Sequence, residues 1–187
     1  RMAMKRLIVP ALATLSLLLA GCGDSGAEQD TPRASSTGGT SNLEAVIGEI
    51  DELSIADKML DNADLTDPFD GAGAYTIFLP DNAAFEALSA AQRKRLESKE
   101  GRPEVIAFLT HHIAVGAVAR ADLDRALDAN GGSIELESVV DEPIEVRKID
   151  GQIFIGKGDD APRLTGTSEL ASNGVVYVID GFIPSAK

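Results

Sequence analysis

The sequence predicts an α+β domain in which helices dominate the first half and strands the second. Apolar residues recur at three- and four-residue spacing as far as His112, as they do on one face of a helix. After residue 133 the period becomes two, and turn signals separate short runs rich in β-branched residues. Helices followed by strands are typical of an α+β architecture and not of a doubly wound parallel sheet.

Two amphipathic helices are predicted before residue 64. The first covers residues 43–50, where the apolar positions are Leu43, Val46, Ile47 and Ile50. The second begins after Ser54, a preferred capping residue, and carries Ile55, Met59 and Leu60. Residues 64–73 are rich in Asp, Gly and Pro and are therefore expected to form a loop.

A strand and three short helices are predicted between residues 75 and 112. The β-branched and aromatic run at 75–79 predicts the strand, and Pro80-Asp81-Asn82 ends it and can cap a helix over Phe85. Ser89 and Gln92 stand at capping-box spacing and open a second helix. Pro103 suits the first turn of a third, whose apolar stripe is Val105, Phe108, Leu109 and His112.

Strands and tight turns are predicted for residues 134–155 and 173–179. Residues 134–139 alternate between two faces. Residues 144–149 and 152–155 flank Asp150-Gly151, a pair that accepts the positive φ angles of a hairpin turn. Asn173-Gly174 is expected to make a similar turn before residues 175–179, a continuous apolar strand that should be buried on both faces.

The amino terminus predicts export and lipid attachment. Lys5 and Arg6 precede an apolar stretch at 7–19, which is shorter than the roughly 20 residues that cross a bilayer. Residues 1–21 therefore have the pattern of an export signal. Leu19-Ala20-Gly21-Cys22 resembles the lipobox of bacterial lipoproteins, which implies a diacylglyceryl group on Cys22. Several acyl chains on one residue anchor a protein stably. The alternative is a free or buried cysteine, since the chain has no second cysteine for a disulfide.

Composition separates a tether from one folded domain. Residues 23–41 contain no aliphatic side chain larger than alanine, so residues 22–41 are expected to be a disordered tether spanning roughly 25 Å. Residues 42–187 suit a single domain. Without residues 1–21 the chain has 14 basic and 30 acidic residues, a net charge of −16. Such a surface repels nucleic acid and anionic lipid, so no nucleic-acid partner is expected.

Three segments resemble the motifs of the fasciclin domain family, in the same order and at similar spacing. They are YTIFLPDNAAFEAL at 75–88, LTHHIAVG at 109–116 and NGVVYVIDGFIP at 173–184. The motif positions are Tyr75, Phe78, Pro80, Asn82, Phe85, His112, Gly116, Asn173, Gly174 and Asp180. The resemblance implies a wedge of about seven strands with several helices, and a module that binds proteins or polysaccharides at cell surfaces.

The chain departs from the family pattern at three positions. Leu79 replaces a small residue before the proline, His111 replaces a tyrosine, and Tyr177 stands where histidine is common. Exposed loops on rigid scaffolds usually carry the binding residues. We therefore expect ligand contact at the loops around the first and closing motifs, with Asp81, His111 and Asp180 as candidate binding residues.

The sequence carries no signature of catalysis. His112 shares the stripe of Phe108 and Leu109, so we interpret it as a hydrogen-bonded core histidine. The alternative is a hydrolase in which His112 works with a carboxylate, although no Gly-x-Ser-x-Gly elbow is present. Side chains of His111 and His112 would diverge by about 100° on a helix and could not readily share a metal. No catalytic residue, cofactor or metal site is expected.

Two acidic loops and one lysine loop suggest ion binding only weakly. Asp64, Asp67 and Asp70 recur every third residue, whereas a helix-loop-helix calcium site needs acidic ligands at alternate positions. Asp159-Asp160 is equally consistent with a solvated turn. Gly156-Lys157-Gly158 lacks the spacing of a phosphate-binding loop.

These observations predict a lipid-anchored binding module of the bacterial cell envelope. Cys22 would hold the chain to the membrane, and the domain would bind an extracellular or envelope protein or polysaccharide. The same sequence is consistent with a periplasmic assembly factor that holds a partner near the membrane. The sequence leaves the oligomeric state and the leaflet open.

Overall fold

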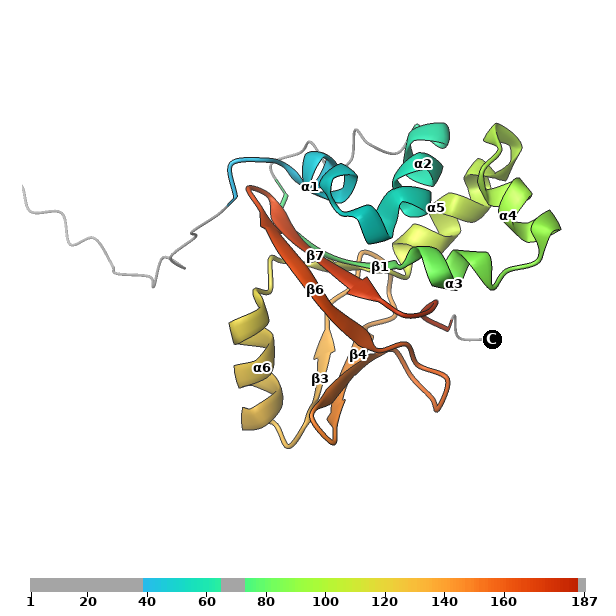
Figure 1. Ribbon diagram of the computed structural model, residues 1–187. Coiled ribbons are helices and arrows are strands. Elements are labelled where there is room, and N and C mark those ends of the chain that lie inside the picture. Colours follow the sequence, from blue (N-terminus) through green and yellow to red (C-terminus); the bar gives the residue numbers. More distant parts are fainter. Residues whose placement is uncertain (1–38, 65–72, 185–187) are drawn as a thin grey trace, which may run out of the picture. The chain divides into compact units, whose positions relative to one another are not determined.

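The computed structural model describes residues 39–64 and 73–184 (Figure 1). The predicted signal peptide, Cys22, most of the tether, Asp67 and Asp70 lie outside the described residues. Within those ranges the chain forms α-helices at Leu43–Glu49 (α1), Ser54–Asn62 (α2), Asn82–Glu86 (α3), Ala90–Leu96 (α4), Arg102–Thr110 (α5) and Arg120–Ala129 (α6). Single 3₁₀ turns lie at Asp51–Leu53 (η1) and Lys99–Gly101 (η3).

The strands form two separate sheets. They span Tyr75–Pro80 (β1), Ile113–Val115 (β2), Ser133–Leu136 (β3), Ile144–Ile149 (β4), Gln152–Ile155 (β5), Leu164–Ala171 (β6) and Gly174–Ile179 (β7). The first sheet has the order β2-β1-β7-β6, with β1 and β7 parallel and the other pairs antiparallel. The second is the antiparallel β3-β4-β5. The predicted α+β class is confirmed.

Strand β7 separates two hydrophobic cores. All six of its residues are buried, as the apolar run predicted. Val176 and Val178 pack into the core beneath α1, α2 and α5, whereas Val175, Tyr177 and Ile179 pack into the core formed with α6 and β3–β5. Figure 1 shows α1–α5 on one side of β1 and β7, and α6 with β3 and β4 on the other. Because successive side chains of a strand point to opposite faces, β7 contributes residues to both cores and connects the helical half of the domain with the strand half.

Helices α3 and α4 begin at the predicted polar caps, whereas the predicted cap Ser54 is the first residue of α2, and Leu53 at the cap position makes no side-chain hydrogen bond. The Asn42 side chain accepts a hydrogen bond from the Ala45 N–H at 3.0 Å, which caps α1. Asp81 caps α3 in the same way through the Ala84 N–H at 2.8 Å. Ser89 and Gln92 form the full capping box of α4, and Pro103 stands in the first turn of α5. These contacts satisfy N–H groups that a helix leaves unpaired at its start.

One predicted turn is confirmed and one is corrected. Asp150 and Gly151 have φ angles of 51° and 80° and join β4 to β5, as the Asp-Gly pair predicted. The second turn does not contain Gly174, because Ala171 pairs with Gly174 and leaves Ser172 and Asn173 as the loop. Gly174 begins β7, where a Cβ atom would collide with the Tyr75 carbonyl oxygen and lie 2.8 Å from Leu43 Cδ1. Glycine is required there for close packing of β1 against β7.

Candidate functional site

The two motif asparagines hold helices in place. Asn82 Oδ1 accepts a hydrogen bond from the Ile55 N–H at 3.0 Å, and Asn82 Nδ2 donates one to the Asp51 carbonyl at 3.0 Å. Asn82 thereby ties the start of α3 to the start of α2. Asn173 Oδ1 accepts from the Leu43 N–H at 2.8 Å and fastens α1 to the loop before β7. Both side chains act as caps supplied from a distant part of the chain.

The aromatic and glycine motif positions are also structural. Phe78 stacks on Tyr177 with ring centroids 5.5 Å apart, and Phe85 packs edge-on against Phe182 at 5.2 Å. Tyr75 and Pro80 are the first and last residues of β1. Gly116 has a φ angle of 90°, which favours glycine, and its carbonyl accepts a hydrogen bond from Thr76.

Tyr177, which replaces the common histidine, is satisfied inside the protein. Its hydroxyl donates a hydrogen bond to the Val118 carbonyl at 2.8 Å, and burial raises the pKa of this phenol. The Tyr177 ring is fully buried beside Phe78. This substitution therefore fills the strand-side core and places no polar group on the surface.

Two of the candidate binding residues have internal partners. Asp81 caps α3 and is half-buried. Asp180 accepts hydrogen bonds from the Arg163 backbone N–H and from Arg163 Nε, each at 2.7 Å. Arg163 Nη2 lies 2.7 Å from the same Asp180 carboxylate and completes a forked ion pair. Both carboxylates therefore have structural partners. Asp180 nevertheless lines a surface hollow with Asp159, Asp160 and Arg163, and His111 lines a different cleft.

His112 is a buried connection between two segments. Helix α5 ends at Thr110, so the predicted stripe reaches His112 beyond the helix end, where the ring packs on Phe108 with centroids 4.1 Å apart. The Ile183 N–H donates to His112 Nε2 at 3.1 Å, so Nδ1 carries the proton and donates to the Phe108 carbonyl at 2.8 Å. The side chain is 1% exposed, and burial lowers its pKa to about 4.

This geometry weighs against a hydrolase that uses His112. A general base needs a free nitrogen within reach of the proton that it removes. Both nitrogens of His112 are engaged, one with Phe108 and one with Ile183, and the ring is closed off from solvent. The arrangement instead connects the end of α5 to the closing segment of the chain.

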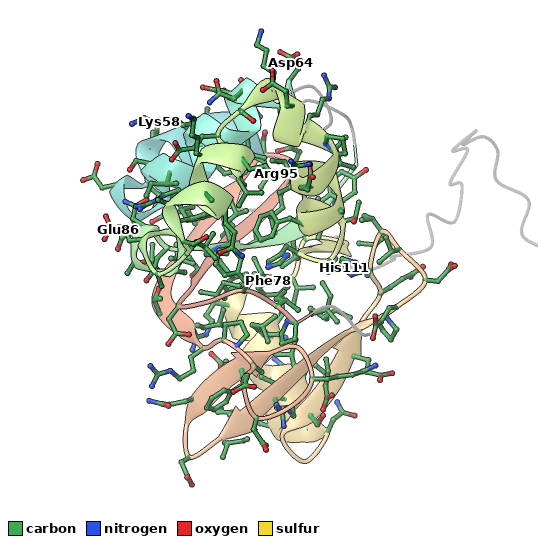
Figure 2. The ribbon with its side chains drawn as sticks, turned by 90° about the vertical axis from the view of Figure 1, so that its right-hand side faces the viewer. Lys58, Asp64, Phe78, Glu86, Arg95 and His111 are labelled. Carbon is green, nitrogen blue, oxygen red and sulfur yellow. The ribbon has the colours of Figure 1, made fainter. Side chains whose placement is uncertain are left out.

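His111 lines a cleft of about 240 Å³. The polar residues of this cleft are His111, Glu142, Glu145 and Lys157, and its apolar residues are Pro143, Ile144, Ile183 and Pro184. The backbone at Gly156 and Gly158 completes the lining. Figure 2 shows His111 at the level where the helices meet the strands, with Phe78 inside the domain. The cleft thus brings together four segments that are distant in sequence.

The two carboxylates of the cleft are in ion pairs that differ in exposure. Lys157 Nζ lies 3.3 Å from Glu142 Oε1, and the two side chains are 55% and 35% exposed. Arg147 Nε lies 3.6 Å from Glu145 Oε1, with side chains only 25% and 26% exposed, and Arg147 Nη2 donates to the Gly158 carbonyl at 2.6 Å. The exposed Lys157–Glu142 pair contributes little to stability, so an incoming ligand can compete with it.

Sequence reasoning named His111 as a candidate and considered Lys157 only as part of a phosphate loop, and it did not place either beside Glu142 and Glu145. The Gly-Lys-Gly stretch was visible, and both glycines have positive φ angles of 95° and 89°. A Cβ atom at Gly156 would lie 2.9 Å from Ile183 Cγ2, so the loop needs glycine to pack against the closing segment. The pairing of this loop with residues 142–145 depends on the β4–β5 hairpin and could not be read from local spacing.

Of the acidic loop with Asp64, Asp67 and Asp70, only Asp64 lies among the described residues. Within residues 39–64 and 73–184, no group of three or more His, Cys, Asp or Glu side chains is arranged to hold a metal ion. Asp64 lies 3.3 Å from Arg102 Nη1 in an exposed ion pair. In the same part of the chain, no helix combines the length and the apolar character needed to cross a bilayer.

The described residues form an α+β domain with a small cleft, and comparison with known proteins identifies its family. The Fasciclin domain model matches residues 51–184, so the chain belongs to the fasciclin domain family. The FAS1 domain pair of the insect cell adhesion molecule Fasciclin I has a similar fold. The TM-score is 0.66 at 18% identity, over 78% of this chain and 51% of that one. The resemblance predicted from the three motifs is confirmed.

Two relatives share the domain in other contexts. Protein sll1483 of Synechocystis sp. is 30% identical over 121 residues, which are 65% of this chain and 61% of that protein. The transforming growth factor-beta-induced protein ig-h3 of Sus scrofa is 26% identical over 121 residues, or 65% of this chain and 16% of that protein. The match therefore covers less than two thirds of either relative. In this family the domain is associated with cell adhesion.

Proposed function

We propose that this chain is a lipid-anchored binding module of the bacterial cell envelope, held to the membrane through Cys22. Its folded domain binds an extracellular or envelope protein or polysaccharide through the His111 cleft. The proposal rests on a difference in environment among the polar residues that the family motifs pointed to. Asp81 and His112 are taken up by internal hydrogen bonds, and Asp180 is held by Arg163 in a separate, polar hollow. His111 instead lines a cleft that combines apolar walls with charged residues.

The family supports the binding class of function. The solved relative is described as a cell adhesion molecule, and the present chain shares its fold. The Leu19-Ala20-Gly21-Cys22 sequence supports the anchor. A lipid attachment is needed for membrane association under this proposal, because a chain of net charge −13 gains no electrostatic attraction to anionic lipid.

Fractionation of a Cys22→Ser variant tests the anchor. The unchanged chain should sediment with membranes and partition into detergent, and the variant should appear in the soluble fraction, because the acylated sulfur is lost. A Ser25→Ala variant, which leaves the attachment residue in place, is the matched control. Membrane association that survives in Cys22→Ser would contradict the anchor.

Ligand capture tests the binding function separately. The full chain, solubilised in detergent and immobilised, is exposed to purified surface polysaccharide and to detergent-extracted envelope proteins from its source. Saturable retention that excess free ligand competes away supports adhesion and identifies the ligand class. Retention of periplasmic assembly proteins alone would favour the assembly-factor hypothesis, and retention no greater than on a charge-matched protein would contradict both.

A further inference from the structure

The His111 cleft is suited to one kind of ligand group. We propose that it takes the side chain of a lysine or arginine that a protein partner presents. This inference rests on the proposed function, in which the cleft is the contact site. It adds the chemistry of the ligand, which neither the fold nor the family specifies.

The first argument is the combination of apolar walls and acidic groups. Pro143, Ile144, Ile183 and Pro184 give the cleft an aliphatic lining, and Glu142 and Glu145 are its carboxylate residues. Lysine and arginine side chains have an aliphatic stem and a cationic end, and they pack the stem on apolar surface while the charge stays at a polar site. A volume of about 240 Å³ is small, and it suits a single side chain better than an extended ligand.

The second argument is that both carboxylates of the cleft already pair with a cation, Glu145 with Arg147 and Glu142 with the more exposed Lys157. Lys157 Nζ lies 3.3 Å from Glu142 Oε1, with the lysine side chain 55% exposed. This pair shows that an ammonium group is accommodated beside Glu142. Because the pair is exposed, Lys157 can swing into solvent when a cation from a partner replaces it.

The third argument is the sign of the surrounding charge. Asp141, Asp159 and Asp160 are exposed and lie one or two residues along the chain from lining positions of the cleft. The whole chain carries a net charge of −13. A field of this sign attracts basic partners and disfavours anionic ones, so an acidic polysaccharide or a phosphate is a poor occupant. The lining also lacks a phenyl, phenol or indole ring on which a neutral sugar could stack.

A peptide competition experiment tests the inference. Four peptides of the form Ac-Gly-Gly-X-Gly-Gly-amide, with X as lysine, arginine, norleucine or glutamate, are immobilised through a long linker. The full chain in detergent flows over them, and free peptide competes. The lysine and arginine peptides should bind, and norleucine and glutamate should not. Binding should weaken as salt rises from about 0.05 M to about 0.5 M, because part of the attraction is between exposed charges.

Three variants locate the binding. Glu142→Gln should weaken binding of the lysine peptide about fivefold, which is the loss of affinity expected for one partly exposed ion pair. Glu86→Gln is the matched control, since Glu86 is exposed and lies on the opposite side of the view from His111 in Figure 2. Lys157→Met should strengthen binding about twofold to threefold, because it removes the competing internal cation. A variant that simply distorted the fold would not bind more tightly.

Each other outcome overturns the inference. If the norleucine peptide binds as well as the lysine peptide, the cleft recognises apolar side chains and not cationic ones. Equal losses in Glu142→Gln and Glu86→Gln would assign the attraction to the acidic surface as a whole. If no peptide binds while polysaccharide is retained in the capture experiment, the ligand class is wrong and the proposed binding function stands. If both experiments fail, the proposed function fails with it.

Discussion

The adjacent histidines, His111 and His112, lie in opposite environments. His112 is 1% exposed and both of its ring nitrogens are hydrogen-bonded, one to helix α5 and one to the closing segment. His111 is half-buried and lines the cleft. The histidine that matches the family motif builds the fold, and the residue that departs from the motif faces the cleft. Ligand choice in this chain is therefore expected to depend on residues outside the family motifs.

The largest expected effect comes from Gly174, where β1 and β7 pack most closely. Gly174→Ala should lower the free energy of unfolding by about 3 kcal/mol, because the new Cβ atom would collide with the Tyr75 carbonyl. Gly48→Ala is the matched control, since the nearest atom to its new Cβ is 3.7 Å away on the Asp57 side chain. The control should gain about 0.5–1 kcal/mol as a helix residue. Urea unfolding of both variants measures the difference, and equal stabilities would refute the packing role.

An intermediate effect is expected at His112, and it should depend on pH. His112→Leu leaves the buried Ile183 N–H unpaired and should cost about 2 kcal/mol at pH 7. The folded pKa of His112 is about 4, below the ordinary value of 6.5, so the unfolded chain takes up the proton first as pH falls. This contribution to stability is present above pH 6.5 and is lost between pH 6.5 and about 4.

The difference in stability between the unchanged protein and His112→Leu should itself depend on pH. Between pH 7 and pH 5 the protein should lose about 2 kcal/mol through His112, a loss that His112→Leu lacks. The two proteins should therefore differ in stability at pH 7 and be nearly equal at pH 5. Urea unfolding of both proteins at both pH values checks this. The titration of the carboxylates is common to the two proteins and cancels in the comparison. A difference that stays constant with pH would show that His112 is not buried in its neutral form.

The smallest effect on stability is expected at His111. His111→Ala should change the free energy of unfolding by less than about 0.5 kcal/mol, because the ring faces the cleft and not the core. Binding of the captured envelope ligand should nevertheless fall severalfold, since the imidazole forms part of the cleft wall. Loss of stability without loss of binding would reverse the roles assigned to the two histidines.

The sequence predicted those elements whose signals were local, and it missed α6 at Arg120–Ala129. The helix caps at Asp81 and Ser89, and the Asp150-Gly151 turn, each depend on residues within a few positions of one another. The role of Gly174 was predicted less well, because a turn signal and a close-packing requirement both select glycine. Only the pairing of β1 with β7 distinguishes the two, and that pairing joins segments about a hundred residues apart.

The candidate site was predicted only in part for the same reason. His111 stood out as a departure from a family motif, whereas Glu142 and Lys157 are ordinary surface residues until the β4–β5 hairpin brings them within 3.3 Å. Asp81 and Asp180 are loop carboxylates beside family motifs, and their local partners become visible only in three dimensions. Sequence patterns therefore indicated which residues matter and did not separate structural from ligand-facing ones.

The course of β7 also determines how the domain bears a pulling force. The chain enters the domain near Ser41, whose carbonyl accepts from the Ser172 N–H at 2.8 Å, just before β7 begins at Gly174. The cleft is bounded by Ile183, four residues after β7 ends at Ile179. Figure 1 places the entering segment and the C-terminal end on opposite sides of the folded domain. Tension between an anchor upstream and a ligand in the cleft would run along β7. The hydrogen bonds from β7 to β1 and β6 lie across the strand. These bonds would therefore be loaded together in shear and would not open one at a time.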